Sequence, residues 1–123
     1  MVSGGRGENA QDAAQRVARD RGEVIGAAER QRVRPGRLGA ERALTLTSRL
    51  LAERGFEPAR ESAACLRLRN CPFHPLTATA PDLVCSLNLA FLAGMVDGLQ
   101  ASTVEAILDP RASECCVELR ART

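Results

Sequence analysis

The segment PDLVCSLNLAFLAGMVDGL, residues 81–99, is the stretch that decides the fold of this chain. Its apolar residues recur at helical spacing around almost the whole circumference: Leu83, Val84, Leu87, Ala90, Phe91, Met95 and Leu99 on one broad face, with Leu89, Leu92 and Val96 on much of the other. A helix that is apolar nearly all round is a buried one. We therefore expect residues 81–99 to form the core, and Gly94 and Gly98 would let a neighbouring element approach closely.

Weaker patterns surround this core helix on both sides. Residues 8–31 show an Ala-rich helical pattern, and a second helix is predicted from about Ala40 to Arg54, before Gly55. Four strand-like segments complete the chain: 56–60, 64–70, 103–108 and 115–119. The order predicts an α+β fold, with two N-terminal helices followed by an antiparallel sheet (β-β-α-β-β) packed on one buried helix.

This pattern divides the chain into two regions. Residues 1–39 form a Gly/Arg/Ala-rich linker and helix, and residues 40–123 form the α+β domain. The Ala-rich helix offers little surface for burial, so we interpret it as a linker or as a seam against a partner. The basic stretch 30–37 contains Pro35-Gly36 and is interpreted as a solvated loop. A phosphate-contacting role is the less favoured alternative, because no recognition-helix pattern follows this stretch. In strand 64–70, alternation directs Arg67 to a half-exposed face that it shares with Cys65.

Composition excludes several classes of function. The net charge is only +2, and Trp and Tyr are absent, which disfavours a stacking platform for single-stranded nucleic acid. The sequence contains neither a signal peptide nor an apolar run long enough to span a bilayer. The five cysteines are an odd number without an export signal, so we expect a cytoplasmic protein whose cysteines are thiols or ligands rather than structural disulfides.

Five residues from three separate segments could converge on a metal. They are Cys71 and His74 in a proline-rich turn, Cys85 in the core helix, and the pair Cys115 and Cys116 near the C-terminus. Three cysteines with one histidine suit structural zinc, and three cysteines with an open position also suit an iron–sulfur cluster. The alternative is that these cysteines are buried apolar residues.

The last predicted strand indicates which of the two neighbouring cysteines, Cys115 or Cys116, would be the ligand. Neighbouring strand residues point to opposite faces, and Cys115 falls on the apolar side with Val117, so Cys115 is favoured over Cys116 as the inward thiol.

A thiol enzyme pairs its nucleophilic cysteine with a histidine and an orienting acid. No such arrangement is apparent in this sequence, which contains only one histidine. We therefore expect this chain not to be an enzyme.

Four stretches carry a resemblance to a known family: NCPFHPL (70–76), PDLVCSLNLAFLAG (81–94), LDPR (108–111) and CCV (115–117). Over residues 40–122 the chain resembles the C-terminal half of bacterial ArsR-like helix-turn-helix regulators, which are related to the iron–sulfur-sensing SUF-operon repressors. The resemblance implies that Cys71, Cys85 and one of Cys115 and Cys116 belong to a cysteine series associated with a cluster. A further cysteine of that series would fall near Leu99, where this chain has none.

The resemblance also implies a function. We expect the effector domain of a bacterial transcriptional regulator, which senses a ligand, a metal or an iron–sulfur centre. Residues 1–39 lack the length and pattern of a winged helix, so DNA would be bound only through a winged-helix domain absent from this chain. A homodimer is the expected assembly. The alternative is a structural or dimerisation module whose buried cysteines bind no metal.

Overall fold

The computed structural model describes residues 9–69, 81–109 and 117–122. These residues form three helices and four strands in the order α1 (Ala10–Val33), α2 (Ala40–Ala52), β1 (Pro58–Ser62), β2 (Cys65–Leu68), α4 (Pro81–Gly98), β3 (Val104–Leu108) and β4 (Val117–Ala121). The predicted α+β class and the predicted order of elements are both confirmed.

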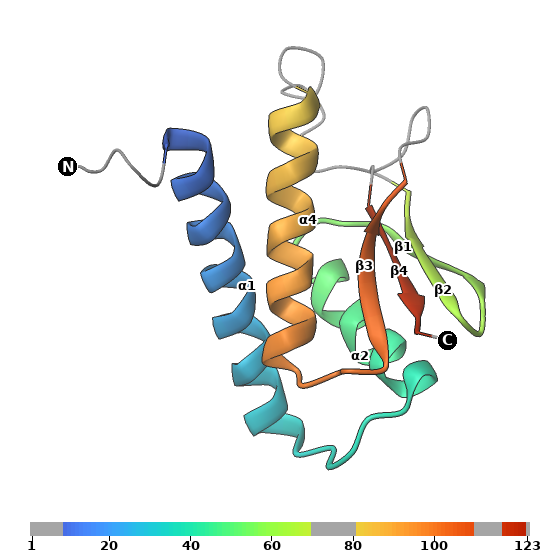
Figure 1. Cartoon of the computed structure of the whole chain (residues 1–123). Helices are drawn as coiled ribbons and strands as arrows, with labels where there is room; N and C mark the ends of the chain where they lie inside the picture. The colour runs from blue at the N-terminus through green and yellow to red at the C-terminus, as the bar shows by residue number, and fades with distance from the viewer. Residues whose placement is uncertain (1–8, 70–80, 110–116, 123) are drawn as a thin grey trace.

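Helix α4 lies at the centre of the molecule, between α1 and the sheet (Figure 1). Leu92 and Met95 are fully buried on it, and the polar Asn88 is also buried. The helix starts at Pro81 and ends at Gly98, within one residue of its predicted bounds. The expectation that residues 81–99 form a buried core helix is therefore confirmed.

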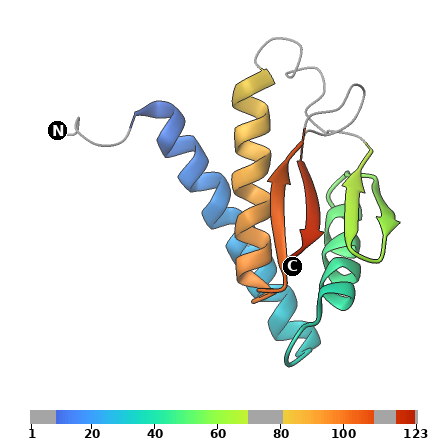
Figure 2. The same cartoon turned by 45° about the vertical axis from the view of Figure 1, so that its right-hand side comes forward.

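The sheet is antiparallel, with the strand order β1-β2-β4-β3. One face carries Leu66, Leu119 and Ala106, which stand opposite one another on β2, β4 and β3. Leu66 and Leu119 are fully buried, so this face packs on the helices. Figure 2 shows α2 behind the β1–β2 side of the sheet and α4 beside the β3–β4 side.

The predicted strands and α2 differ from the structure mainly at their ends. β1 begins at Pro58 rather than at Phe56, because Phe56 packs into the core as the chain leaves α2. The helix predicted from about Ala40 is confirmed as α2, which ends at Ala52 and buries Leu44, Leu50 and Leu51. Strand 64–70 differs in one important respect. Arg67 was expected on a half-exposed face, but its side chain is only 1% exposed, and an ion pair with Glu118 compensates its buried charge.

Helix α1 begins where the side chain of Asn9 accepts a hydrogen bond from the amide of Asp12. It packs along α4, and its Ile25 belongs to the same apolar core as the residues of the sheet. Glu29, near its C-terminal end, accepts hydrogen bonds from Arg32 and from Arg49 of α2. The division of the chain at residue 39 stays a prediction, but α1 is clearly in contact with the α+β unit.

None of the three described helices combines the length and the apolar character needed to cross a membrane.

Candidate functional site

The seam between α1 and α4 is the most distinctive packing in the structure. Each helix contributes two glycines four residues apart, and the helices run in the same direction (Figure 1). A Cβ atom placed on Gly22 would lie 2.9 Å from the backbone nitrogen of Met95, and one on Gly98 would lie 2.7 Å from that of Ala27. Only residues without a Cβ allow two helix backbones to come this close.

Gly26 and Gly94 complete the same contact. A Cβ on Gly26 would lie 2.9 Å from the amide nitrogen of Leu99, and one on Gly94 would lie 2.9 Å from the carbonyl carbon of Arg19. The close approach predicted for Gly94 and Gly98 is thereby confirmed, and the neighbouring element is α1. An ion pair between Arg19 and Asp97 also joins the two helices. Backbone touches backbone along this seam, so a displacement of α4 acts on α1 directly.

Of the five predicted metal ligands, the structure describes only Cys85. It lies on α4, half-buried and packed against the core. It is disulfide-bonded, so the expectation that the cysteines are thiols or ligands rather than disulfides is wrong at this position. Its disulfide partner lies outside the described residues, as do Cys71, His74, Cys115 and Cys116. Within residues 9–69, 81–109 and 117–122, no three His, Cys, Asp or Glu side chains are grouped to hold a metal. The predicted ligand set therefore stays a prediction.

The oxidation state of Cys85 decides whether it can serve as a ligand. Metals are bound by thiolates, and a sulfur in a disulfide is not available as one. A centre at Cys85 would thus require the reduced cysteine together with donors from the segments that hold the other four predicted ligands. Reduction of the disulfide and binding of a metal are linked steps at this position.

Cys65 on β2 is a free thiol of a different kind. Burial raises the pKa of its sulfur, and the negative charges of Glu118 and Glu61 raise the pKa further. A thiol with a raised pKa stays protonated at neutral pH and is a poor ligand and nucleophile. Cys65 is therefore an unlikely metal ligand in the folded protein.

Next to Cys65 lies an ionic cluster on the sheet face opposite to that of Leu66. Arg67 stands across from Glu118 in the β2–β4 register, and their side chains are 2.7 Å apart and both 1% exposed. Arg67 also donates to the carboxylate and the carbonyl oxygen of Asp109, at 3.1 and 2.5 Å. Arg120 pairs with the other carboxylate oxygen of Glu118. Each buried charge is thus matched, as burial requires.

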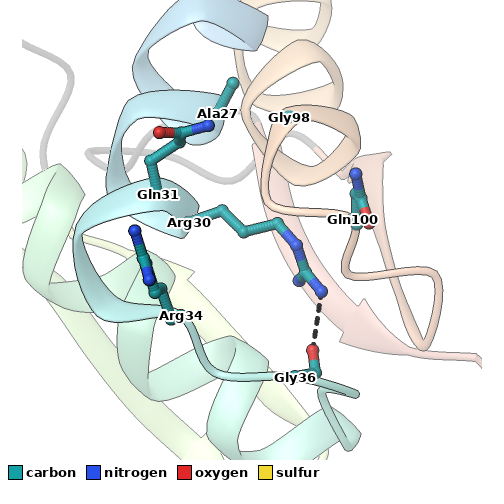
Figure 3. Close-up of a pocket in the computed structure, with 7 residues that line it drawn as sticks. All are labelled: Ala27, Arg30, Gln31, Arg34, Gly36, Gly98 and Gln100. Atoms are coloured by element: carbon teal, nitrogen blue, oxygen red, sulfur yellow. Dashed lines mark hydrogen bonds between the residues drawn. The ribbon is translucent and has the colours of Figure 1, made fainter.

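A basic cleft lies at the C-terminal ends of α1 and α4 (Figure 3). It has two adjoining lobes of about 600 and 760 Å³, which share Arg30, Gly36 and Gln100. Arg34 lines the first lobe and Arg37 the second. None of the described residues that line either lobe is acidic, so the cleft carries an excess of positive charge.

Arg30 is fixed in position within this cleft. Its guanidinium donates to the carbonyl oxygen of Leu99 at 2.8 Å. It also donates to the carbonyl oxygen of Gly36 at 2.7 Å, as Figure 3 shows. These bonds tie the end of α4 and the 34–39 loop to α1. A guanidinium has five N–H donors, so Arg30 keeps donors beyond these two bonds.

Sequence reasoning did not identify three of these features. Gly22 and Gly26 lie in an Ala-rich helix, where their spacing was a signal that could have been paired with Gly94 and Gly98. The stretch 30–37 was interpreted as a solvated loop, but residues 30–33 belong to α1, and Arg30, Arg34 and Arg37 line a cleft. The burial of Arg67 had no local signal, since Glu118 lies 51 residues away.

Comparisons of the chain with protein-family models, with curated proteins and with solved structures find no match.

Proposed function

We propose that this chain is the effector-sensing domain of a bacterial transcriptional regulator, in which a metal or iron–sulfur centre involving Cys85 acts on α1 through α4. The observation that carries the proposal is the position of Cys85 on the helix whose backbone touches α1 at Gly22 and Gly26. The chemistry of the site comes from the resemblance to the SUF-repressor relatives, and the route of communication comes from the helix seam.

The seam suits the transmission of a small displacement. Long side chains can absorb a shift by changing rotamer, whereas a contact between two backbones cannot. A change at Cys85 that moves or rotates α4 is therefore passed to α1. Closely packed interfaces tend to switch between discrete arrangements, which is how sub-ångström changes at a sensor site become larger ones elsewhere.

Helix α1 is the output element in this proposal. It is 24 residues long, and much of its surface away from α4 is exposed, including Val17 and Val24. The described helices and strands are α1 and the elements of the α+β unit that it contacts. DNA contacts would accordingly come from a separate winged-helix domain, and α1 would report the state of the cysteine centre to it.

The test is an anaerobic preparation under reducing conditions, followed by an absorption spectrum and a metal assay. We expect a thiolate–iron absorption band, or stoichiometric zinc, in the wild-type chain and its loss in Cys85→Ser. Cys65→Ser is the matched control and should keep the centre, because Cys65 is a protonated thiol beside Glu118. A folded, metal-free wild-type protein would refute the proposed centre.

Hydrogen exchange of the same samples tests the coupling. Formation of the centre should change the amide protection of residues 10–33, and Cys85→Ser should show no such change when iron or zinc is added. A centre that forms without any change in α1 would leave a structural metal site and exclude the proposed communication.

A second candidate function is dimerisation without a metal, and one observation favours it. Val17 and Val24 are 60% and 62% exposed, and they lie two turns apart on the side of α1 that faces away from α4. In an antiparallel pair of α1 helices, Val17 of one copy can lie against Val24 of the other. The same register sets Asp20 against Arg21 of the second copy, so the surface is complementary to itself.

Sedimentation equilibrium of the metal-free protein tests this second function. Val17→Glu/Val24→Glu should give a monomer, because four carboxylates would face one another across the pair. Ala52→Glu/Ala63→Glu adds the same charge at exposed positions away from α1 and should leave the dimer intact. A wild-type protein that is monomeric at all concentrations would exclude self-association through α1.

A further inference from the structure

We propose that the basic cleft at the C-terminal ends of α1 and α4 binds a small organic anion through its phosphate or carboxylate group. This site lies apart from Cys85 and goes beyond the proposed function, because no cysteine takes part in it. It is defined here as the cleft lined by Arg30, Arg34, Arg37, Gln100 and Thr103.

Charge is the first observation. Three arginines line the cleft, and none of its described lining residues is acidic. Within the described ranges, Arg34 and Arg37 form no ion pair, in contrast to Arg19, Arg32, Arg49, Arg67 and Arg120. Arg34 and Arg37 are exposed, so their guanidinium groups are available to a ligand. Arginine forms paired hydrogen bonds with planar carboxylates and with phosphates.

Preorganisation is the second observation. Arg30 is anchored by the carbonyl oxygens of Leu99 and Gly36, so an anion would not need to order this side chain on binding. Thr103 donates its hydroxyl to the carbonyl oxygen of Leu38, which fixes the far wall of the second lobe. The walls of the cleft are thus held by hydrogen bonds before any ligand enters.

The start of α2 adds to the positive potential. Gly39 lines the second lobe and directly precedes α2, and no side chain caps the first turn of that helix. Helix N-termini carry partial positive charge on their unpaired amides. An oxyanion in the second lobe would therefore meet both Arg37 and the open end of a 13-residue helix.

Size and shape decide between a small molecule and nucleic acid. Each lobe has a volume within the range of about 300–1,000 Å³ that is typical of small-molecule sites. A nucleic-acid backbone requires a longer basic track, preferably with aromatic residues, and the chain contains no Trp or Tyr. A concave site with clustered arginines is therefore best suited to a compact ligand that carries an anionic group.

Isothermal titration at constant ionic strength tests the proposal with four probes: inorganic phosphate, adenosine monophosphate, citrate and adenosine. The anions should bind and adenosine should not. A preference for phosphate probes over citrate, or the reverse, would identify which oxyanion the cleft takes. Arg34→Gln/Arg37→Gln should weaken binding by at least about tenfold, because two charged donor groups are lost.

Arg54→Gln/Arg69→Gln is the matched control, since it removes two exposed charges outside the cleft. It should bind the anions as the wild-type protein does. Equal weakening in both double variants would show a non-specific charge effect and overturn the proposal. So would a wild-type protein that binds none of the three anions.

Amide chemical shifts provide a second measurement that does not depend on the double variants. The bound anion should shift the resonances of Gly36, Gly39 and Gln100 and leave those of β1 unchanged. Shifts spread evenly over the basic surface would contradict a defined site even if the titration detected binding.

Discussion

Gly22 of α1 lies against Phe91 of α4 so closely that a Cβ atom on the glycine would overlap the carbonyl group of Phe91. The relationship is mirrored on the other helix, where Gly94 lies against the backbone of Arg19. Two helices that are separated in sequence by α2 and two strands are therefore joined at their backbones. The seam is a structural property in its own right, whatever the chain binds.

Substituting alanine at Gly22 or Gly94 should destabilise the protein. The added methyl group has no space, so the helices must separate, and overpacking of this kind costs about 1–3 kcal/mol. At an uncrowded helix position, glycine to alanine would stabilise the protein by about 0.5–1 kcal/mol. The sign of the change in unfolding free energy therefore distinguishes a close helix contact from an open one. Chemical denaturation of each variant measures the free energy of unfolding.

Gly39→Ala is the control for this prediction. Nothing lies within 4 Å of a Cβ at Gly39, and its φ of −73° suits any residue. Because glycine is preferred over alanine at the N-cap of a helix, its cost should be about 0.5–1 kcal/mol, which is below that of Gly22→Ala. If Gly22→Ala were as stable as Gly39→Ala, the close helix approach would be wrong.

The elements could be predicted from sequence because their signals are local. The apolar spacing in residues 81–99 and the Leu44, Leu50 and Leu51 stripe each depend on neighbours within a few turns. The pairing of α1 with α4 could not be predicted in this way. Gly94 and Gly98 indicated that another element packs closely against the core helix. Which element it is depends on contacts between residues about 70 positions apart in the sequence.

The candidate sites also divide into features with a local sequence signal, which could be predicted, and features that depend on tertiary contacts, which could not. Cys85 was placed correctly on the core helix, because it lies within a strong periodic pattern. The arginines of the cleft look like an ordinary solvated loop in sequence, since their convergence depends on the chain turning at Gly36 against the end of α4. Arg67 was misjudged for a similar reason, because alternation places a residue on a sheet face without indicating what covers that face.

Removing one charge of the Arg67–Glu118 pair should lower the free energy of unfolding more than removing both charges. Glu118→Leu leaves Arg67 buried without its closest carboxylate, and breaking a buried pair typically costs about 3–5 kcal/mol. Arg67→Met/Glu118→Leu leaves neither charge and should be more stable than Glu118→Leu alone. Urea denaturation of the single and double variants measures the difference. A double variant less stable than the single one would show that the pair is not the source of the cost.

Stability should fall in acid because of two carboxylates. Hydrogen bonds from Arg32 and then Arg49 outweigh burial and hold the pKa of Glu29 below its ordinary value of 4.5. Burial by itself raises the pKa of Glu118, but the hydrogen bonds from Arg67 and Arg120 outweigh it and lower the pKa. A carboxyl group with a lowered pKa in the folded state stabilises the protein above its unfolded pKa. That contribution is lost as the pH falls below about 4.5 towards the folded pKa.

The free energy of unfolding measured between pH 7 and pH 3 tests this expectation. Glu29→Gln should reduce the loss of stability in acid, because one of the two contributing groups no longer titrates. Glu23→Gln removes an exposed carboxylate from the same helix and should leave the acid dependence close to that of the wild type. Identical pH profiles for the wild type and Glu29→Gln would contradict the assignment.

Cys65 should react slowly with alkylating reagents while the protein is folded. Burial, together with the charges of Glu118 and Glu61, raises the pKa of this thiol, so little thiolate is present at pH 7. Iodoacetamide labelling followed by peptide mass analysis measures its rate separately from those of the other cysteines. We expect the native rate at Cys65 to rise steeply with pH and to remain below the rate in denaturant. Labelling at pH 7 that is equally fast in the native and the denatured chain would mean that the thiol is neither shielded nor held protonated by its neighbours.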